Sequence, residues 1–234
     1  DFIKHVDGSY KLSIKFTDFY KKGEAFHYPF GKPAIEQTKN DANDWWFKKM
    51  LHPKTPYSDY ADCLYPLQMA YVNHNKFDIK EVARAYHFDA TKFGLWLKNN
   101  YCKKVKHILD DVVSIEQDEN GITSLNNKYK ADLYIDCTGF KSLLLDKTLK
   151  EPFESYSDML PNDSAWATRI KYKDKEKELV PYTNCTAIEN GWVWNIPLWS
   201  RIGTGYVYSS KFVDDETALK EFKKHLGQED LEFK

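Results

Sequence analysis

The sequence of 234 residues has no excess of charge of either sign and no long apolar run. Its 34 basic and 35 acidic residues give a net charge of -1, which offers no electrostatic footprint for nucleic acids or anionic membranes. A membrane-spanning helix needs about 20 consecutive apolar residues, and no segment approaches that length. The first ten residues show no signal-peptide pattern. We therefore expect a cytoplasmic protein that binds neither nucleic acid nor membrane.

Closely spaced cysteines and paired histidines are also missing. The four cysteines lie far apart and form no Cys-x-x-Cys pair, and the seven histidines form no i, i+4 or His-x-His pair. Disulfide scaffolds and zinc sites both need such clustering. We therefore expect four reduced, mostly buried thiols and no bound metal.

Hydrophobic patterns predict a mixed α/β protein (α+β) with a large antiparallel sheet. Residues 20–40 are expected to be loop, and 41–75 helical in parts between prolines. Asp89 can cap a helix that runs to Tyr101, and Asp214 or Asp215 can cap a second helix that Gly227 ends. Strands are expected at 9–19, 111–115, 122–125, 131–136, 166–172, 183–188, 192–196 and 205–209.

Aromatic residues are unusually common, at 16% of the chain. Two of them, Trp192 and Trp194, lie in the sequence GWVWNIP at 191–197. On a strand both indoles would leave the same face and form a flat wall, and Pro197 would end the strand or place it at an edge. Such a wall is either ordinary core or one side of a site for a planar ligand.

The sequence ADLYIDCTGFKSLLL at 131–145 predicts a strand, a turn and a helix that starts near Ser142. Gly139 would let a phosphate approach the backbone at the helix start. Asp136 would either bind a ligand hydroxyl or hold the turn through backbone N–H groups. Val112, on an earlier strand, would either pair with an adenine edge or lie in the core. The plain alternative is a structural junction without a ligand.

Two further stretches could contact a ligand. Gly203-Thr204-Gly205 is typical of a hairpin turn, because no helix follows it, and nearby Arg201 would face solvent or meet a phosphate. The sequence AFHYPFGKP at 25–33 would either grip an aromatic substrate or fold over the core.

Together these stretches resemble the flavin-dependent halogenases, and most closely the tryptophan halogenases. The family signature Trp-x-Trp-x-Ile-Pro is present as Trp192, Trp194, Ile196 and Pro197. Further stretches are similar to the family in sequence and order: AYHFDA (85–90), IDCTGF (135–140), EPF (151–153), DSAWAT (163–168), PYT (181–183) and GTGYVYSS (203–210).

The resemblance implies a flavin monooxygenase-like FAD-binding fold and a halogenase. In the family, FADH2 from a separate flavin reductase, together with O2 and halide, yields hypohalous acid, which a Lys directs onto an electron-rich indole or phenol-like substrate. The four signature residues would form an active-site wall between the flavin and the substrate. The other implied contacts are with FAD (Val112, Asp136, Gly139) and with the aromatic substrate (Phe30, His27, Tyr28).

Two departures from the family pattern matter. No Gly-x-Gly-x-x-Gly fingerprint occurs, so residues 1–234 are expected to be the central part of a single halogenase domain, with the catalytic Lys and its partner Glu outside. In addition, Tyr28 stands where family members have His, and His27 is one position off register. A flavin-dependent aromatic monooxygenase and a non-catalytic aromatic-ligand binding domain are the alternatives, and a homo-oligomer is left open.

Overall fold

The computed structural model describes residues 2–33, 42–56, 59–77, 82–228 and 231. The chain divides into two compact units, one formed by residues 1–103 and 160–234 and the other by residues 104–159. The prediction that all 234 residues belong to one halogenase domain concerns a longer protein, and it stays a prediction.

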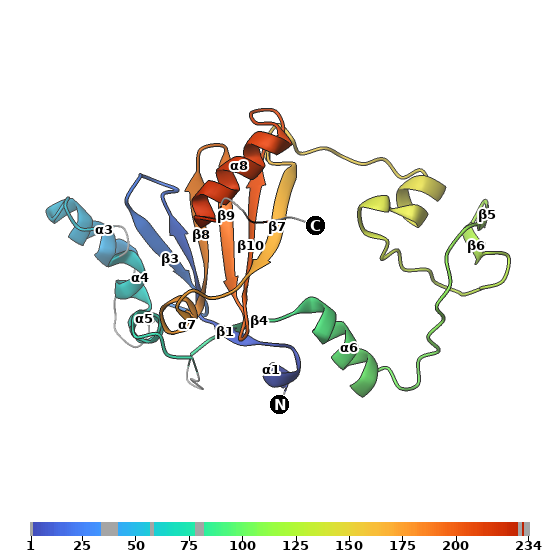
Figure 1. The fold of residues 1–234 in the computed structure, drawn as a ribbon, viewed down its shortest axis with the longest axis horizontal. Helices are drawn as coiled ribbons and strands as arrows, with labels where there is room; N and C mark the ends of the chain where they lie inside the picture. Colours follow the sequence, from blue (N-terminus) through green and yellow to red (C-terminus); the bar gives the residue numbers. More distant parts are fainter. Residues whose placement is uncertain (1, 34–41, 57–58, 78–81, 229–230, 232–234) are drawn as a thin grey trace. The chain divides into compact units, whose positions relative to one another are not determined.

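The larger unit is built on a six-stranded sheet with the order β3-β2-β8-β9-β10-β7 (Figure 1). Neighbouring strands are antiparallel except for β2 and β8, which are parallel. This confirms a mixed α/β fold with a large and mostly antiparallel sheet. The strands are β2 (Ser13–Thr17), β3 (Ala25–Pro29), β7 (Ser164–Ile170), β8 (Tyr182–Ile188), β9 (Gly191–Pro197) and β10 (Ile202–Tyr208).

The expected single strand at 9–19 is two strands. β1 (Ser9–Lys11) pairs with β4 (Ala85–His87) in a separate two-stranded sheet, whereas β2 joins the large sheet. The chain changes partners at Leu12, whose N–H donates to the Pro181 carbonyl (2.7 Å) and whose side chain is fully buried. An alternating pattern does not reveal such a switch, because both strands keep the same period.

The expected loop at 20–40 contains strand β3, and residues 34–41 lie outside the described residues. β3 pairs antiparallel with β2 and places Phe26 opposite Phe16, with the two rings stacked at 5.2 Å. Cross-strand aromatic pairs stabilise a hairpin, and this pair explains why a stretch with flanking glycines and prolines forms a strand.

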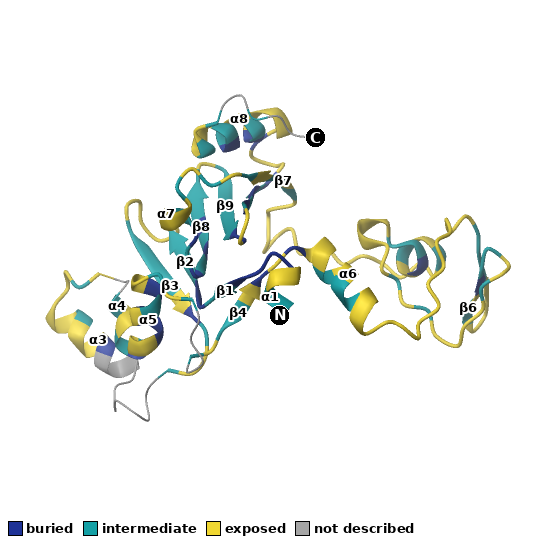
Figure 2. Cartoon of the chain, turned by 60° about the horizontal axis from the view of Figure 1, so that its bottom comes forward, coloured by how far each residue is buried: buried dark blue, intermediate teal, exposed yellow. Residues whose placement is uncertain are grey.

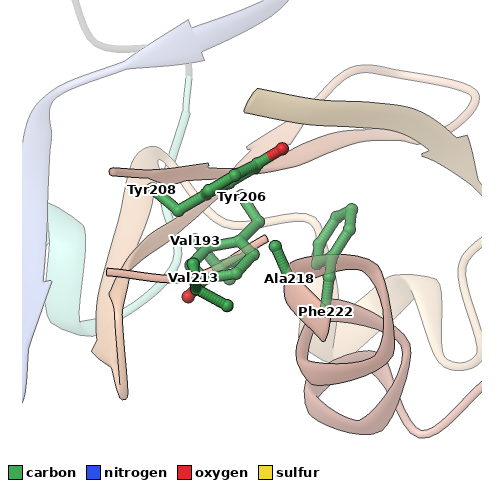
Figure 3. Close-up of a cluster of buried hydrophobic side chains, with 6 residues drawn as sticks. All are labelled: Val193, Tyr206, Tyr208, Val213, Ala218 and Phe222. Atoms are coloured by element: carbon green, nitrogen blue, oxygen red, sulfur yellow. The ribbon is translucent and has the colours of Figure 1, made fainter. Parts of the chain in front are cut away.

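Helix α8 (Asp215–Leu226) covers one face of the sheet. Phe222 and Ala218 are fully buried against Val193 and Tyr206, which point from β9 and β10 (Figure 3). The helix begins as predicted, because the Asp214 carboxylate accepts the Thr217 N–H (2.8 Å). It ends at Gly227, which has a φ of 61°.

The other α-helices of the described residues also belong to the larger unit. The predicted helix after Asp89 is present as α6 (Ala90–Asn100), and the Asp89 carboxylate accepts the N–H groups of Thr91 and Lys92. Residues 41–75 are helical in pieces as expected, with Pro66 in the first turn of its helix. A second core cluster is formed by Leu12, Ala61, Met69 and Val72. The other helices are α1 (Phe2–His5), α3 (Ala42–Leu51), α4 (Asp59–Leu64), α5 (Pro66–Asn73) and α7 (Lys175–Glu178).

The smaller unit has a hairpin of β5 (Ile115–Asp118) and β6 (Gly121–Leu125), followed by the short helical turns η1 (Gly139–Lys141) and η2 (Leu143–Thr148). The strand expected at 111–115 begins only at Ile115. The strand expected at 131–136 does not form, because no neighbouring strand within the described residues pairs with it, and Leu133 and Ile135 are exposed. Figure 2 shows most of this unit in the colour of exposed residues.

Among the helices of the described residues, none is long and apolar enough to cross a membrane.

Candidate functional site

One face of the six-stranded sheet carries a row of aromatic side chains, which we call the aromatic row. Its rings are Phe26, Phe16, Phe19, Trp192 and Trp194. Successive ring centroids lie 5.2, 5.2, 6.5 and 6.1 Å apart. Both indoles leave the face opposite to Val193, which lies between them in β9 and points to helix α8. Because both indoles are only half-buried, the row presents flat ring surface instead of disappearing into a core.

Trp194 lies opposite Cys185 on β8 and Gly205 on β10. A Cβ on Gly205 would be 2.1 Å from two indole carbons, so the indole occupies the space above this glycine. This corrects the turn expected at 203–205: those residues lie inside β10, and the turn between β9 and β10 is at 198–201, where the N–H of residue 198 donates to the Arg201 carbonyl (2.8 Å).

The other two signature residues end strand β9. Ile196 is half-buried and lies opposite Gly203. Pro197 is buried and is the last residue of the strand, as its missing N–H predicts. Its carbonyl accepts a hydrogen bond from the Ser9 hydroxyl (2.5 Å), so the end of the signature is tied to strand β1.

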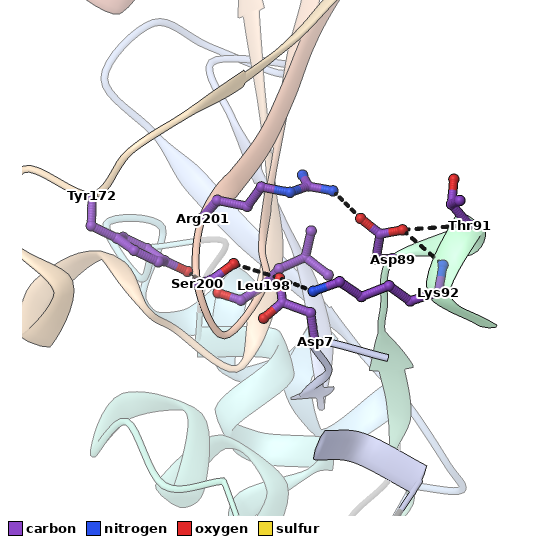
Figure 4. Close-up of polar contacts among 8 residues, drawn as sticks. All are labelled: Asp7, Asp89, Thr91, Lys92, Tyr172, Leu198, Ser200 and Arg201. Atoms are coloured by element: carbon purple, nitrogen blue, oxygen red, sulfur yellow. Dashed lines mark hydrogen bonds and ion pairs between the residues drawn. The ribbon is translucent and has the colours of Figure 1, made fainter. Parts of the chain in front are cut away.

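Polar contacts hold the turn that follows β9 (Figure 4). Arg201 forms an ion pair with Asp89 (Nη2 to Oδ2, 2.7 Å), and Ser200 donates to Asp7 (Oγ to Oδ2, 2.6 Å). Tyr172 donates its hydroxyl to a carbonyl of the same turn. The guanidinium of Arg201 holds the pKa of Asp89 below its usual range. Arg201 therefore neither faces solvent nor is free for a phosphate.

Lys11 is a candidate that was not predicted, because the catalytic lysine was expected outside residues 1–234. It ends strand β1, and its Nζ lies 5.4 Å from the centroid of the Phe30 ring. Burial lowers its pKa, while the nearby Cys185 thiol has a smaller opposite effect. Desolvated lysines with a lowered pKa are typical of functional sites. The signal in the sequence was a lysine between the strand residues Tyr10 and Leu12.

Strand alternation separates the three predicted substrate residues. His27 points away from the aromatic row, bonds to Ser13 (Nδ1 to Oγ, 2.9 Å) and contacts the Tyr182 ring edge-on at 5.0 Å. Burial lowers the pKa of His27 to about 4. Tyr28 leaves the same face as Phe26 and is 64% exposed, while Phe30 lies beside Lys11. The structure thus brings Phe30 to the lysine and keeps His27 away from the indoles.

In the smaller unit, Asp136 holds the turn that follows it. One carboxylate oxygen accepts the Thr138 N–H (3.0 Å) and hydroxyl (2.6 Å), and the other accepts the N–H groups of Leu144 and Leu145 (2.9 and 3.1 Å). These bonds, the hydroxyl of Thr138 first, lower the pKa of Asp136 to about 2. Of the two roles expected for Asp136, the structure shows the one that stabilises the turn.

The remaining predicted flavin residues are exposed. Gly139 has a φ of 64°, and nothing lies within 4 Å of where its Cβ would be. The open backbone at Gly139 fits the close approach of a phosphate-bearing group. Val112 is 41% exposed in an irregular segment instead of a strand, while the next amide, that of Val113, donates to Asn126 (2.8 Å).

The thiols and potential metal ligands of the described residues form no cluster. Among the described residues no three His, Cys, Asp or Glu side chains gather to hold a metal ion. All four cysteines are free, but Cys102 and Cys137 are exposed, which corrects the expectation that most are buried. Both lie in irregular segments, Cys102 after helix α6 and Cys137 before η1.

The comparisons agree with the geometry. A flavin-dependent halogenase from Xanthomonas campestris, Xcc4156, has the same fold, with a TM-score of 0.82 and 25% identity over 100% of this chain and 47% of that one. The tryptophan 6-halogenase SttH of Streptomyces toxytricini has a TM-score of 0.82 and 31% identity over 98% of this chain and 48% of that one. These structures define the class: the fold is that of the flavin-dependent halogenases.

The tryptophan halogenase family matches residues 1–233, and the chain belongs to this family. Tryptophan 7-halogenase RebH of Lentzea aerocolonigenes is 33% identical over 95% of this chain and 46% of the relative. The chain therefore spans about half the length of the curated relatives it matches.

Proposed function

We propose that the intact protein is a flavin-dependent halogenase that acts on an electron-rich aromatic compound such as an indole or a phenol. The observation that carries this proposal is the aromatic row on one sheet face together with the half-buried Lys11 beside Phe30. The family membership and the relatives named as tryptophan halogenases support it. Reduced FAD, when bound, supplies with O2 and halide the hypohalous acid that halogenates the substrate.

Lys11 is the residue that we propose to direct the oxidant. The family lysine was expected outside these residues, but the burial of Lys11 and its contact with Phe30 favour Lys11 in its place. Its ammonium can bind hypohalous acid and donate a proton to its oxygen, so that the oxygen–halogen bond breaks, water leaves and the halogen bonds to a ring carbon. That carbon then releases its hydrogen as a proton, which the neutral amine of Lys11 can accept, and the ring becomes aromatic again. The lowered pKa of Lys11 favours this proton donation. Phe30, next to the ammonium, would stack on the substrate ring.

The other predicted residues take supporting roles in this proposal. Trp192, Trp194, Ile196 and Pro197 would form the wall that keeps the substrate from the flavin and the oxidant from water. Tyr28 would contact the substrate from β3, whereas His27 has no such role. In the smaller unit, Gly139 and the Val112 amide would contact FAD. A separate flavin reductase would supply FADH2, and a homo-oligomer fits the proposal.

The test uses the intact protein with reduced FAD, an indole, and bromide or chloride. We expect halogenated product from the unaltered protein, and a loss of about a hundredfold or more in Lys11→Met. Lys15→Met is the matched control, because Lys15 lies on β2 beside His27, on the sheet face opposite the aromatic row, and the variant should keep nearly full activity.

Two results would contradict the proposal. Hydroxylated product without halogenated product would favour an aromatic monooxygenase. An intact protein that binds no flavin in a fluorescence titration would favour a non-catalytic binding domain.

A further inference from the structure

His87 is a buried histidine that the proposed reaction does not use. It ends strand β4, lies opposite Ser9 on β1 and is only 4% exposed. Its Nδ1 lies 3.3 Å from the Ser9 hydroxyl, and its Nε2 lies 2.9 Å from the Thr183 hydroxyl on β8. The ring therefore joins three strands that are far apart in the sequence.

The hydrogen-bond directions follow from counting protons. A serine hydroxyl has one proton, and Ser9 donates it to the Pro197 carbonyl (2.5 Å). Ser9 must therefore accept from His87, which places a proton on Nδ1. The imidazole is neutral, because burial first and the positive charge of Lys11 second lower its pKa to about 3. Nε2 is then an acceptor, and Thr183 donates to it.

The bonds of His87 connect the strand that carries Lys11 to β8 and to the end of β9. Ser9 and Lys11 are two apart on β1, so their side chains leave the same face of that strand. Thr183 and Cys185 are likewise two apart on β8, and Cys185 lies opposite Trp194. On the other side of Lys11, the N–H of Leu12 donates to the Pro181 carbonyl. The chain is thus held at Ser9, before Lys11, by the His87 network and at Leu12, after it, by the residue that precedes β8.

We infer that His87 is a positioning residue for Lys11, held as the Nδ1–H tautomer so that it ties strand β1 to Thr183 and to the end of the Trp-x-Trp-x-Ile-Pro strand. This inference rests on the proposed function. It assigns to the AYHFDA stretch at 85–90 the task of keeping the lysine in register with the aromatic row.

The experiment measures two products of the intact protein supplied with reduced FAD, halide and an indole. In one assay the indole is left out, and free hypohalous acid is captured with an activated methylene compound. In the other assay the indole is present, and the halogenated indole is measured. A displaced Lys11 lowers the amount of halogenated indole without lowering the amount of captured hypohalous acid, whereas a general loss of structure lowers both amounts. The readout is the ratio of halogenated indole to captured oxidant.

We expect this ratio to fall roughly tenfold or more in His87→Leu and in Thr183→Val, because small displacements of a reacting group are costly. His87→Asn keeps a donor for Ser9 and should retain more of the ratio than His87→Leu. Thr186→Val is the matched control: it is the same substitution on the same strand, on the opposite face, and should leave the ratio unchanged.

An unchanged ratio in Thr183→Val and His87→Leu would overturn the inference. If His87→Leu does not fold, Thr183→Val decides by itself, because valine has nearly the same shape as threonine and removes only the donor to Nε2. Absence of halogenated indole with the unaltered protein would instead refute the proposed function, and this inference with it.

Discussion

The indole of Trp194 lies against Gly205 on the adjacent strand so closely that a Cβ on residue 205 would be 2.1 Å from two ring carbons. Glycine is unfavourable within a strand, where it often marks the close approach of another group. Here that group is a side chain of the Trp-x-Trp-x-Ile-Pro signature. Gly205 in the family-like sequence GTGYVYSS therefore leaves the space that the Trp194 indole of the signature occupies.

Gly205→Ala should displace the Trp194 indole and lower the free energy of unfolding. The new methyl group would also lie 2.7 Å from the backbone carbonyl of Trp166, which a sheet cannot easily move. Overpacking of this kind costs about 1–3 kcal/mol. Denaturant unfolding of the intact protein, followed by tryptophan fluorescence, measures the cost and reports the indole environment.

Gly94→Ala is the control for this substitution. Gly94 lies in helix α6, and nothing lies within 4 Å of where its Cβ would be. The same change should therefore stabilise the protein by about 0.5–1 kcal/mol. Equal effects of the two substitutions would show that Gly205 is not specifically required beneath the indole.

Hydrophobic periodicity predicted the strands and helices whose spacing of apolar residues differs from that of the segments around them. Strands β7 to β10 and the capped helices α6 and α8 are present close to their predicted positions. The partner change at Leu12 and the strand at 25–29 were missed, because each depends on which strand lies alongside. The stretch at 131–136 has the apolar sequence of a strand but no partner in the described residues, and sequence alone does not supply one.

The candidate site was predictable where the alternation of side chains along a strand determines which face they share. The spacing of Trp192 and Trp194 fixed their common face, and the sheet register bears this out. The same alternation, applied to β3, would have separated His27 from Tyr28 if a strand had been expected there. Lys11 could not be singled out from the sequence, because its burial and its contact with Phe30, which follows β3, appear only in the folded chain.

Trp194→Ala should leave the protein folded but shift its products. Truncation of a fully buried Trp costs about 3–5 kcal/mol, and the cost should be smaller here because this indole is half-buried. Without the Trp194 indole the wall is open, and less hypohalous acid should react with the substrate. Released peroxide or hydroxylated product should therefore rise relative to halogenated product. Product analysis and a peroxide assay on the intact protein measure both.

Trp199→Ala provides the comparison for the wall. Trp199 is 60% exposed, beyond the end of β9, and contacts Lys175 instead of the aromatic row. The substitution Trp199→Ala should therefore leave the product distribution unchanged. If Trp194→Ala merely unfolds the protein, the indole acts mainly as core.

Burial of His87 and partial burial of His27 should make the protein sensitive to acid. The pKa of His87 is lowered to about 3 by burial first and by Lys11 second, whereas an unfolded chain has histidines with a pKa of about 6.5. Between these two values the unfolded chain binds more protons than the folded one, so the free energy of unfolding decreases as the pH falls. His27, with a pKa of about 4, acts in the same direction.

Urea unfolding at a series of pH values should therefore show that the free energy of unfolding depends on pH between about pH 6.5 and about pH 4, with a slope that is shallower in His87→Asn. An equal slope in the variant would mean that the imidazole of His87 is not held neutral, and the tautomer on which the Ser9–Thr183 connection depends would lose its basis.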